Sequence, residues 1–430
     1  MSDLKQWAAT SSGASLSKIF IGRMIKSREI GKRVRSISHH ASLMPNTSSA
    51  SEKLINLHTS SLANKSNAFT PSEKANFVNR FLPNKWTDVD KLDSGLFRCI
   101  HLPNERFVTI GQDKSLRFYI RQPPRYQFID QIGIPNNGFI TDFARSTKGD
   151  QLAYTTSNAY ARSSRSGLFG HTSDTSAYHC SIDQINDGLL QWNRFQPNQE
   201  RIPRRRDAFF SICYTMDDQN LVIGRAGGRI SIVGVDEHTH YSFDGHENDV
   251  KAIHCSKANP NLFYSGCSDG FCKMWDCRTP NKSIPLASSF TNDYAITHID
   301  CDTFDRYVVI TSGGVKFDIL DVRQFSEVIS FDIKQKHQES NLWGDIPTFY
   351  KAMTIKKQNL SAIFWRVKFS PRRTGHRFIY CGSNIGTISI FDIVTGEMVK
   401  EFTRDECEVY DCSWHPNDNE IVSVSVRSVS

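Results

Sequence analysis

The residues best placed to do chemistry stand at the end of the segment FYSGCSDGFCKMWDCR, residues 263–278. Arg278 follows Asp276 by two residues, and Arg323 follows Asp321 by two residues. A guanidinium group can bind a carboxylate through two parallel hydrogen bonds, or bind backbone carbonyls. Two interpretations remain open for each arginine: it pairs with an acidic residue of a neighbouring element, or it is presented to a partner.

The other reactive side chains do not form a known catalytic or metal-binding pattern. The sequence contains no phosphate-binding loop, no G-x-S-x-G motif and no paired zinc ligands. Cys267, Cys272 and Cys277 are five residues apart across a predicted strand–turn–strand, so we do not expect their thiols to converge on one ion. The basic loop RIPRRR, residues 201–206, is either a solvated run of charges or a binding site for an acidic segment of a partner. We therefore expect no enzyme activity, no metal and no cofactor.

Composition and charge limit the class of protein. The chain has 430 residues, of which 39% are hydrophobic and 11% aromatic, so it can bury a substantial core. Its 11 cysteines, without a secretory leader, indicate a reducing compartment, and no apolar run is long enough to predict a membrane span. Residues 1–80 hold 12 basic and 4 acidic residues, which leaves 40 basic and 41 acidic residues in the remainder. This balance argues against a nucleic-acid-binding face after residue 80 and leaves open only a local patch.

Short alternating strands recur after residue 80, separated by tight turns. Gly234, Asp276 and Asp321 occupy the same place in successive repeats, at separations of 42 and 45 residues. This period is typical of a four-stranded propeller blade. Arg278 and Arg323 then lie in consecutive blades on one face, which favours presentation to a partner. We predict an all-β chain with seven blades, at about 85–122, 136–186, 205–240, 245–282, 290–325, 361–396 and from 403 onward.

Two insertions and an incomplete last blade are also predicted. The insertions are residues 160–176, which are small and polar, and residues 326–360. The last blade stops about one strand early after EIVSVSV, and residues 81–89 could supply its outer strand. An unpaired strand of this composition would be an aggregation hazard, so we expect the chain to be a shortened form.

The segment GHENDV followed by YSGCSDGFCKMWD resembles a WD repeat, with Gly-His near the start and Trp-Asp near the end. The resemblance implies a hydrogen-bonded structural tetrad of His246, Ser265, Asp269 and Trp275. A buried aspartate requires such partners. We therefore interpret these four residues as holding the blade together, and His246 as neither a catalytic base nor a metal ligand.

The Asp-x-Arg endings resemble the motif of WD-repeat substrate receptors for cullin-4 ubiquitin ligases. From about residue 80 to 420, segments such as DGHENDV, KFSPRRTGHRFIYCGSNIG and YDCSWHPNDNEIVS resemble the DDB1- and cullin-4-associated factor 11 family. The resemblance implies a non-catalytic receptor that docks through Asp276, Arg278, Asp321 and Arg323 onto the adaptor, damaged-DNA-binding protein 1, and brings an unknown protein substrate to the cullin-4 ligase core. The insertion at 160–176 and the chain end depart from the family. The alternative is a WD-repeat scaffold in a non-ubiquitin complex, in RNA processing or chromatin.

Residues 1–80 are rich in serine and asparagine, and we predict a disordered basic arm ahead of a propeller at 81–430. The stretch KIFIGRMIKSREIGKRVRSISHH is open to three interpretations: a solvated tail, a nuclear-import patch or a mitochondrial leader. Glu29 and Asp3 count against the leader. We expect the protein in the nucleus and cytoplasm.

Overall fold

The chain divides into two units, Met1–Phe81 and Leu82–Ser430. The computed structural model describes the following residues of the second unit: 82–83, 87–92, 95–157 without 112, 124, 136 and 137, 175–182, 192–195, 208–324 without 237–239, 280–281, 292–293 and 314–315, 353–354, 366–425 without 384–385, 394–396 and 404–407, and 428–429. The predicted arm, residues 160–174 of the first predicted insertion and the basic loop at 201–206 lie outside these residues. Among the described residues, no helix is long and apolar enough to cross a membrane.

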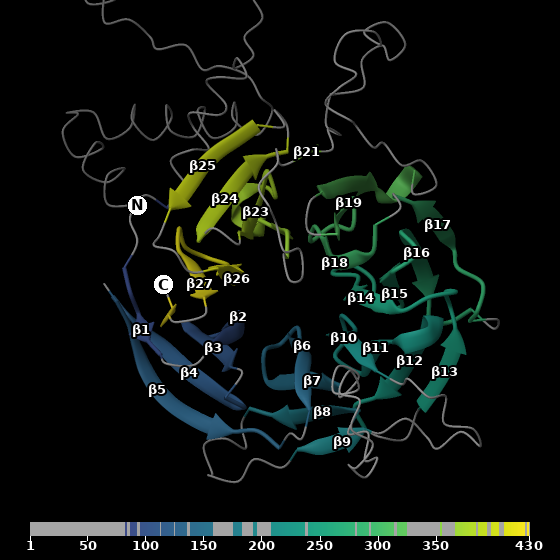
Figure 1. The fold of residues 1–430 in the computed structure, drawn as a ribbon, viewed down its shortest axis with the longest axis horizontal. Helices are drawn as coiled ribbons and strands as arrows, with labels where there is room; N and C mark the ends of the chain where they lie inside the picture. Colours follow the sequence, from purple (N-terminus) through teal and green to yellow (C-terminus); the bar gives the residue numbers. More distant parts are fainter. Residues whose placement is uncertain are drawn as a thin grey trace, which may run out of the picture. The chain divides into compact units, whose positions relative to one another are not determined.

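The described strands form seven antiparallel sheets of four strands each, and the sheets follow one another around a ring (Figure 1). The first sheet contains β2 Leu96–Leu102, β3 Arg106–Gly111, β4 Ser115–Gln122 and β5 Arg125–Gly133, and the second contains β6 Phe139–Arg145, β7 Gln151–Ser157, β8 Ser176–Ser181 and β9 Asn193–Phe195. The third contains β10 Phe209–Tyr214, β11 Asn220–Arg225, β12 Arg229–Gly234 and β13 His240–Asp244, and the fourth contains β14 Val250–Cys255, β15 Leu262–Cys267, β16 Phe271–Asp276 and β17 Ala287–Phe290. The fifth sheet contains β18 Ile296–Cys301, β19 Tyr307–Ser312, β20 Lys316–Asp321 and β21 Met353–Thr354, and the sixth contains β22 Lys368–Phe369, β23 Phe378–Gly382, β24 Thr387–Asp392 and β25 Glu397–Thr403. The seventh contains β26 Val409–Trp414, β27 Ile421–Ser425, β28 Ser428–Val429 and β1 Asp90–Lys91. The predicted seven-bladed β-propeller is confirmed.

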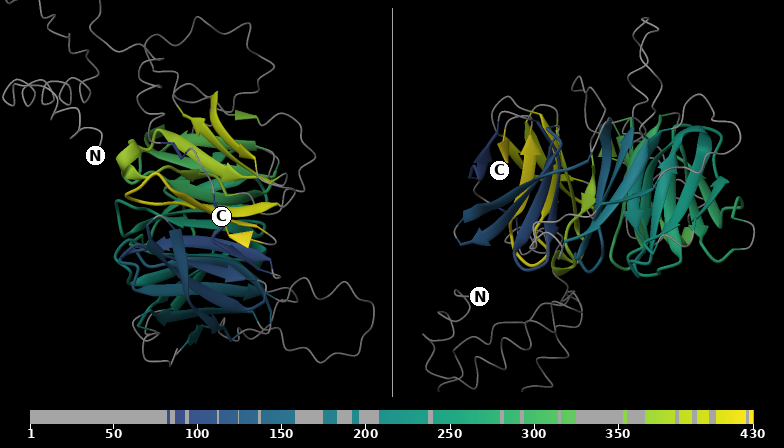
Figure 2. Two further views of the ribbon diagram at one scale, coloured as in Figure 1. Left: turned by 90° about the vertical axis from the view of Figure 1, so that its left-hand side faces the viewer. Right: turned by 90° about the horizontal axis from the view of Figure 1, so that it is seen from below.

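The seventh sheet joins the two ends of the propeller. Strand β1 pairs with β28, and β26 packs against β2 of the first sheet, so the ring is closed in sequence order and in space. The edge-on views in Figure 2 show the purple and yellow strands side by side at this junction. The outer strand comes from Asp90–Lys91, just after the predicted 81–89, and the third strand is Ser428–Val429. Both are two residues long, so the last blade is reduced.

The predicted blade limits need correction at the fourth strand. Five edge strands begin at or beyond the predicted blade ends of 122, 186, 240, 282 and 396: β5, β9, β13, β17 and β25. The predicted limits depend on the residues that share one position in the repeats, such as Asp276, and these residues end the third strand. The edge strand comes after them and has a weaker alternation of apolar and polar residues. Within the predicted insertion 326–360, Met353–Thr354 form β21, the edge strand of the fifth blade.

Trp275 packs at the contact between the third and fourth blades. Its side chain is buried together with Ile230 of β12 and Phe263 of β15. A Cβ atom at Gly245 would lie 3.1 Å from the Trp275 ring and 2.9 Å from Ile230, so only glycine fits there without displacing them. Leu320 and Phe391 take the register position of Trp275 in the fifth and sixth blades, which explains why a single repeat motif undercounts the fold.

A network of buried charges crosses the centre of the ring, here called the channel, around which the first strands of the sheets are arranged (Figure 1). Arg98 of β2 forms ion pairs with Asp142 of β6 and with Asp411 of β26. Arg366, from the sixth blade, reaches across the ring to within 3.1 Å of Asp142, and Lys368 lies 2.6 Å from Asp411. These pairs satisfy charges that burial would otherwise make very unfavourable. A second cluster joins Lys257 of the fourth blade to Asp300 of the fifth at 2.6 Å.

Buried histidines beside this network predict acid sensitivity. Burial lowers the pKa of His254 to about 4, and burial also holds the pKa of His298 and His101 well below the ordinary value. In the unfolded chain the pKa of histidine is about 6.5. Between these values the unfolded chain binds protons that the folded chain does not, so the free energy of unfolding should fall as the pH drops from about 6.5 to 4.

The measurement is urea unfolding at pH 7.5, 6.0 and 5.0. The aspartates Asp142, Asp300 and Asp411 have lowered pKa values, although burial opposes the shift, because basic partners stabilise their charge. Their contribution is lost only below about pH 4. A free energy of unfolding that stays constant from pH 7.5 to 5.0 would contradict the assignment of neutral, buried histidines.

Candidate functional site: the Asp-x-Arg face

The structure brings the predicted tetrad together inside the fourth blade. Trp275 Nε1 donates a hydrogen bond to Ser265 Oγ at 2.7 Å, and Ser265 Oγ lies 2.7 Å from His246 Nε2. Indole N–H can only donate, so the serine accepts from Trp275 and can give its own proton to His246 Nε2. The histidine hydrogen then sits on Nδ1, on the side of Asp269.

Asp269 is the loosest member of the tetrad. Its Oδ2 lies 3.9 Å from His246 Nδ1, too far for a hydrogen bond, while its Oδ1 accepts from the backbone N–H of Phe271 at 3.0 Å. Burial, assisted by the charge of Lys273, lowers the pKa of His246 to about 3. His246 is therefore neutral at physiological pH, and its contact with Asp269 is not an ion pair there.

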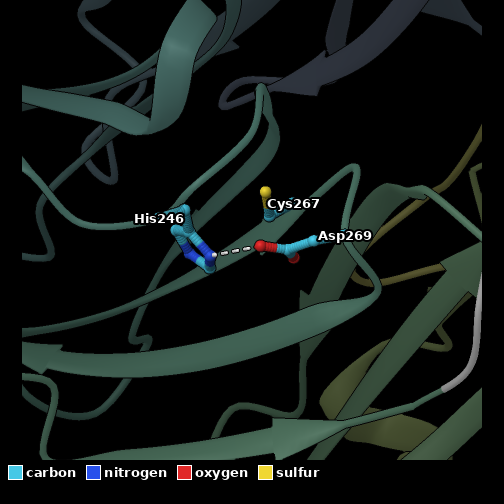
Figure 3. Close-up of side chains that lie close together, drawn as sticks. All are labelled: His246, Cys267 and Asp269. Atoms are coloured by element: carbon cyan, nitrogen blue, oxygen red, sulfur yellow. Dashed lines mark ion pairs between the residues drawn. The ribbon is translucent and has the colours of Figure 1, made fainter.

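His246 and Asp269 face each other, and Cys267 lies beside them, as Figure 3 shows. Among the described residues, their ligand atoms form a group within 4.8 Å that could hold a metal ion. Burial raises the pKa of the Cys267 thiol to about 12, so this sulfur is protonated and a poor ligand near neutral pH. The sequence pattern relates Cys267 only to Cys272 and Cys277, and it does not predict that Cys267 lies beside the tetrad. The signal was its position two residues before Asp269.

Arg278 forms a two-pronged ion pair with its own blade's Asp276. The guanidinium donates from Nε to Oδ1 at 3.0 Å and from Nη2 to Oδ2 at 2.7 Å, and the backbone N–H of Arg278 also donates to Oδ1 at 2.8 Å. These hydrogen bonds from Arg278 lower the pKa of the Asp276 carboxyl. The Arg278 side chain is 66% exposed, whereas that of Asp276 is 12% exposed, so the guanidinium covers its carboxylate.

Arg323 repeats this arrangement in the fifth blade. It donates from Nε to Asp321 Oδ1 at 2.9 Å and from Nη2 to Oδ2 at 2.5 Å, with exposures of 70% for Arg323 and 8% for Asp321. Both aspartates end the third strand of their sheets, β16 and β20. Equivalent strands end at the same face of a propeller, so the two arginines share a face, as predicted.

The sixth blade treats the equivalent aspartate differently. Asp392 ends β24 but pairs with Arg377, whose Nη2 lies 2.7 Å from Asp392 Oδ2 and whose side chain is largely buried. Arg377 precedes the second strand of its own sheet, so this pair is internal to the blade. Among the described residues, the fork with an exposed arginine two positions after the aspartate occurs in adjacent blades four and five.

The ring of four-stranded sheets and the Gly-His/Trp-Asp repeat define a WD-repeat β-propeller. Residues 238–276 match the family model described as "WD domain, G-beta repeat". The motif therefore covers one repeat, and the other blades are established by the fold.

More particularly, the chain is similar to proteins named "DDB1- and CUL4-associated factor 11 homolog". The one from Caenorhabditis elegans is 25% identical over 82% of this chain and 63% of its own length; the one from Caenorhabditis briggsae is 25% identical over 92% and 73%. The LEC14B protein of Lithospermum erythrorhizon is 28% identical over 66% of this chain and 61% of its own length. This chain thus spans less than two thirds of the C. elegans relative. The family resemblance inferred from the sequence is confirmed as a similarity over most of the chain.

Proposed function

We propose that this chain is a non-catalytic substrate receptor that links a target protein to the cullin-4 RING ubiquitin ligase. It would do so by docking its Asp-x-Arg face onto the adaptor, damaged-DNA-binding protein 1. The observation that carries the proposal is the pair of exposed guanidinium forks, Arg278 and Arg323, held alike in adjacent blades.

The geometry suits recognition by a partner. Each fork is fixed by its own aspartate and backbone, so little side-chain freedom is lost on binding. The Arg278 fork uses Nε and Nη2, so other N–H groups of this guanidinium can donate to a carboxylate or carbonyl of the adaptor. The two relatives above are named for association with DDB1 and CUL4, and we extend that association to this chain as part of the proposal.

The receptor would hold its target elsewhere on the propeller. Because Arg366 reaches Asp142 across the channel, we propose that a target segment binds at a channel mouth and does not thread through the ring. The nucleus and cytoplasm are the proposed locations. His246 and Ser265 are engaged with Trp275 inside the blade, which supports a structural and not a catalytic use of these groups.

The test is purification of the affinity-tagged chain from cells, followed by mass spectrometry of what accompanies it. We expect the adaptor and cullin-4 in amounts comparable to the chain itself. Recovery of RNA-processing or chromatin complexes without the adaptor would overturn the proposal and favour a scaffold.

A further inference from the structure

An exposed phenylalanine lies on the same face as the two arginine forks. Phe304 belongs to the turn between β18 and β19 in the fifth blade, and 47% of its surface is exposed. The backbone N–H of Val322, which links Asp321 to Arg323, donates to the carbonyl of Arg306 at 2.9 Å. This bond places the turn that carries Phe304 at the same edge of the sheet as Arg323.

Two guanidinium groups flank the Phe304 ring. The Arg306 Cζ atom lies 4.9 Å from the ring centroid, and the Arg372 Cζ atom, from the sixth blade, lies 5.1 Å from it. Both distances are within the range of cation–π attraction. The Arg306 side chain is 48% exposed, and its Nε lies 3.1 Å from Oδ2 of Asp302, whose side chain is fully buried. The exposed side chains of Arg278, Phe304, Arg306 and Arg372 therefore bring three cationic groups and one aromatic ring to this face, across three blades.

The turn is held rigidly from both sides. The Asp305 carboxylate accepts from Ser256 Oγ and from the backbone N–H of Lys257 in the fourth blade. The backbone N–H of Thr303 donates to His376 Nε2 in the sixth blade at 3.3 Å. A large apolar side chain on a clamped turn is exposed without being mobile, so binding through it loses little conformational entropy.

Other blades carry a polar residue at this point of the turn. The hydrogen-bonding pattern aligns Phe304 with Lys148 in the second blade, Asp217 in the third and Asn417 in the seventh. Packing of the fold therefore does not require a phenylalanine here. Exposed aromatics next to arginine are typical of the residues that dominate protein–protein binding energy.

We infer that Phe304, between Arg306 and Arg372, is a second anchor for the adaptor beside the Asp-x-Arg forks. This inference rests on the proposed function. The complementary adaptor surface is an acidic loop that also carries an apolar side chain: the apolar group packs on Phe304, and the carboxylates accept from the arginines. The surface that we call the Phe304 anchor consists of Phe304, Arg306 and Arg372.

The experiment measures binding of the purified chain to the purified adaptor by biolayer interferometry at two salt concentrations. We expect Phe304→Ala to weaken binding at least tenfold and to keep the salt dependence. Arg372→Ala should weaken binding less and reduce the salt dependence, because it removes a charge. The matched control is Phe128→Ala, whose phenylalanine is 46% exposed on edge strand β5 and should leave affinity unchanged.

The outcomes separate this inference from the proposed function. If Arg278→Ala weakens binding while Phe304→Ala behaves like Phe128→Ala, docking stands and the Phe304 anchor is overturned. If the wild-type chain does not bind the adaptor, both are overturned. If Phe304→Ala keeps wild-type affinity but changes the chain from dimer to monomer in light scattering, the surface joins copies of the chain and the inference fails.

Discussion

Replacement of Trp275 by alanine is expected to lower the free energy of unfolding by about 3–5 kcal/mol. The side chain is buried between two blades, packs edge-to-face on Phe243 at 5.2 Å, and donates to Ser265. Its loss leaves a large cavity and removes a hydrogen-bond donor from a buried polar chain. The measurement is urea unfolding followed by circular dichroism.

Two further variants make the Trp275 result specific. Trp275→Phe keeps most of the ring volume but loses the N–H donor, so it should be less destabilising than alanine. Asp269→Ala should also have a smaller effect, about 1 kcal/mol, because Asp269 is 3.9 Å from His246 and its clear hydrogen bond is to one backbone N–H. A Trp275→Ala chain with wild-type stability that merely loses partner binding would refute the structural role.

The fourth blade was predictable because it carries a complete repeat. His246, Ser265 and Trp275 occur at the expected spacing, and their hydrogen bonds are found in the structure. The neighbouring blades were found by period alone, since Leu320 and Phe391 replace the tryptophan. The edge strands were placed less well because they follow the repeat marker and have one partner strand, which leaves a weak alternating pattern.

Other features could not be predicted because they depend on contacts between distant residues. Arg98, Asp142 and Arg366 meet in the channel from three blades, and each is an unremarkable charged residue in its own segment. Phe304 is also ambiguous in sequence, since a phenylalanine in a strand-rich repeat is usually buried. Its exposure follows from a tight turn that Asp302 and Asp305 organise.

Removal of both guanidinium forks is expected to nearly abolish adaptor binding while the propeller stays folded. Each arginine is exposed and preorganised, and truncation of an interface arginine that acts as a hot spot weakens binding by about 30-fold. Independent effects multiply, so Arg278→Ala combined with Arg323→Ala should weaken binding by about a thousandfold. Part of this loss reflects Asp276 and Asp321, which become uncovered and repel an acidic partner surface.

Conservative and distant variants control for charge and folding. Arg278→Lys keeps the positive charge but cannot form the fork, so its affinity should fall between the wild type and Arg278→Ala. Arg125→Ala removes an exposed arginine from edge strand β5 of the first blade and should bind normally. Each of these variants, including the double variant, should melt at nearly the wild-type temperature, because exposed ion pairs contribute little to stability.

The most direct measurement of the docking claim is the dissociation constant of the purified adaptor for the wild-type chain, each single arginine variant and the double variant. The account predicts measurable wild-type binding, a loss in each single variant, a multiplied loss in the double variant and unchanged melting temperatures. Wild-type affinity in the double variant would contradict it.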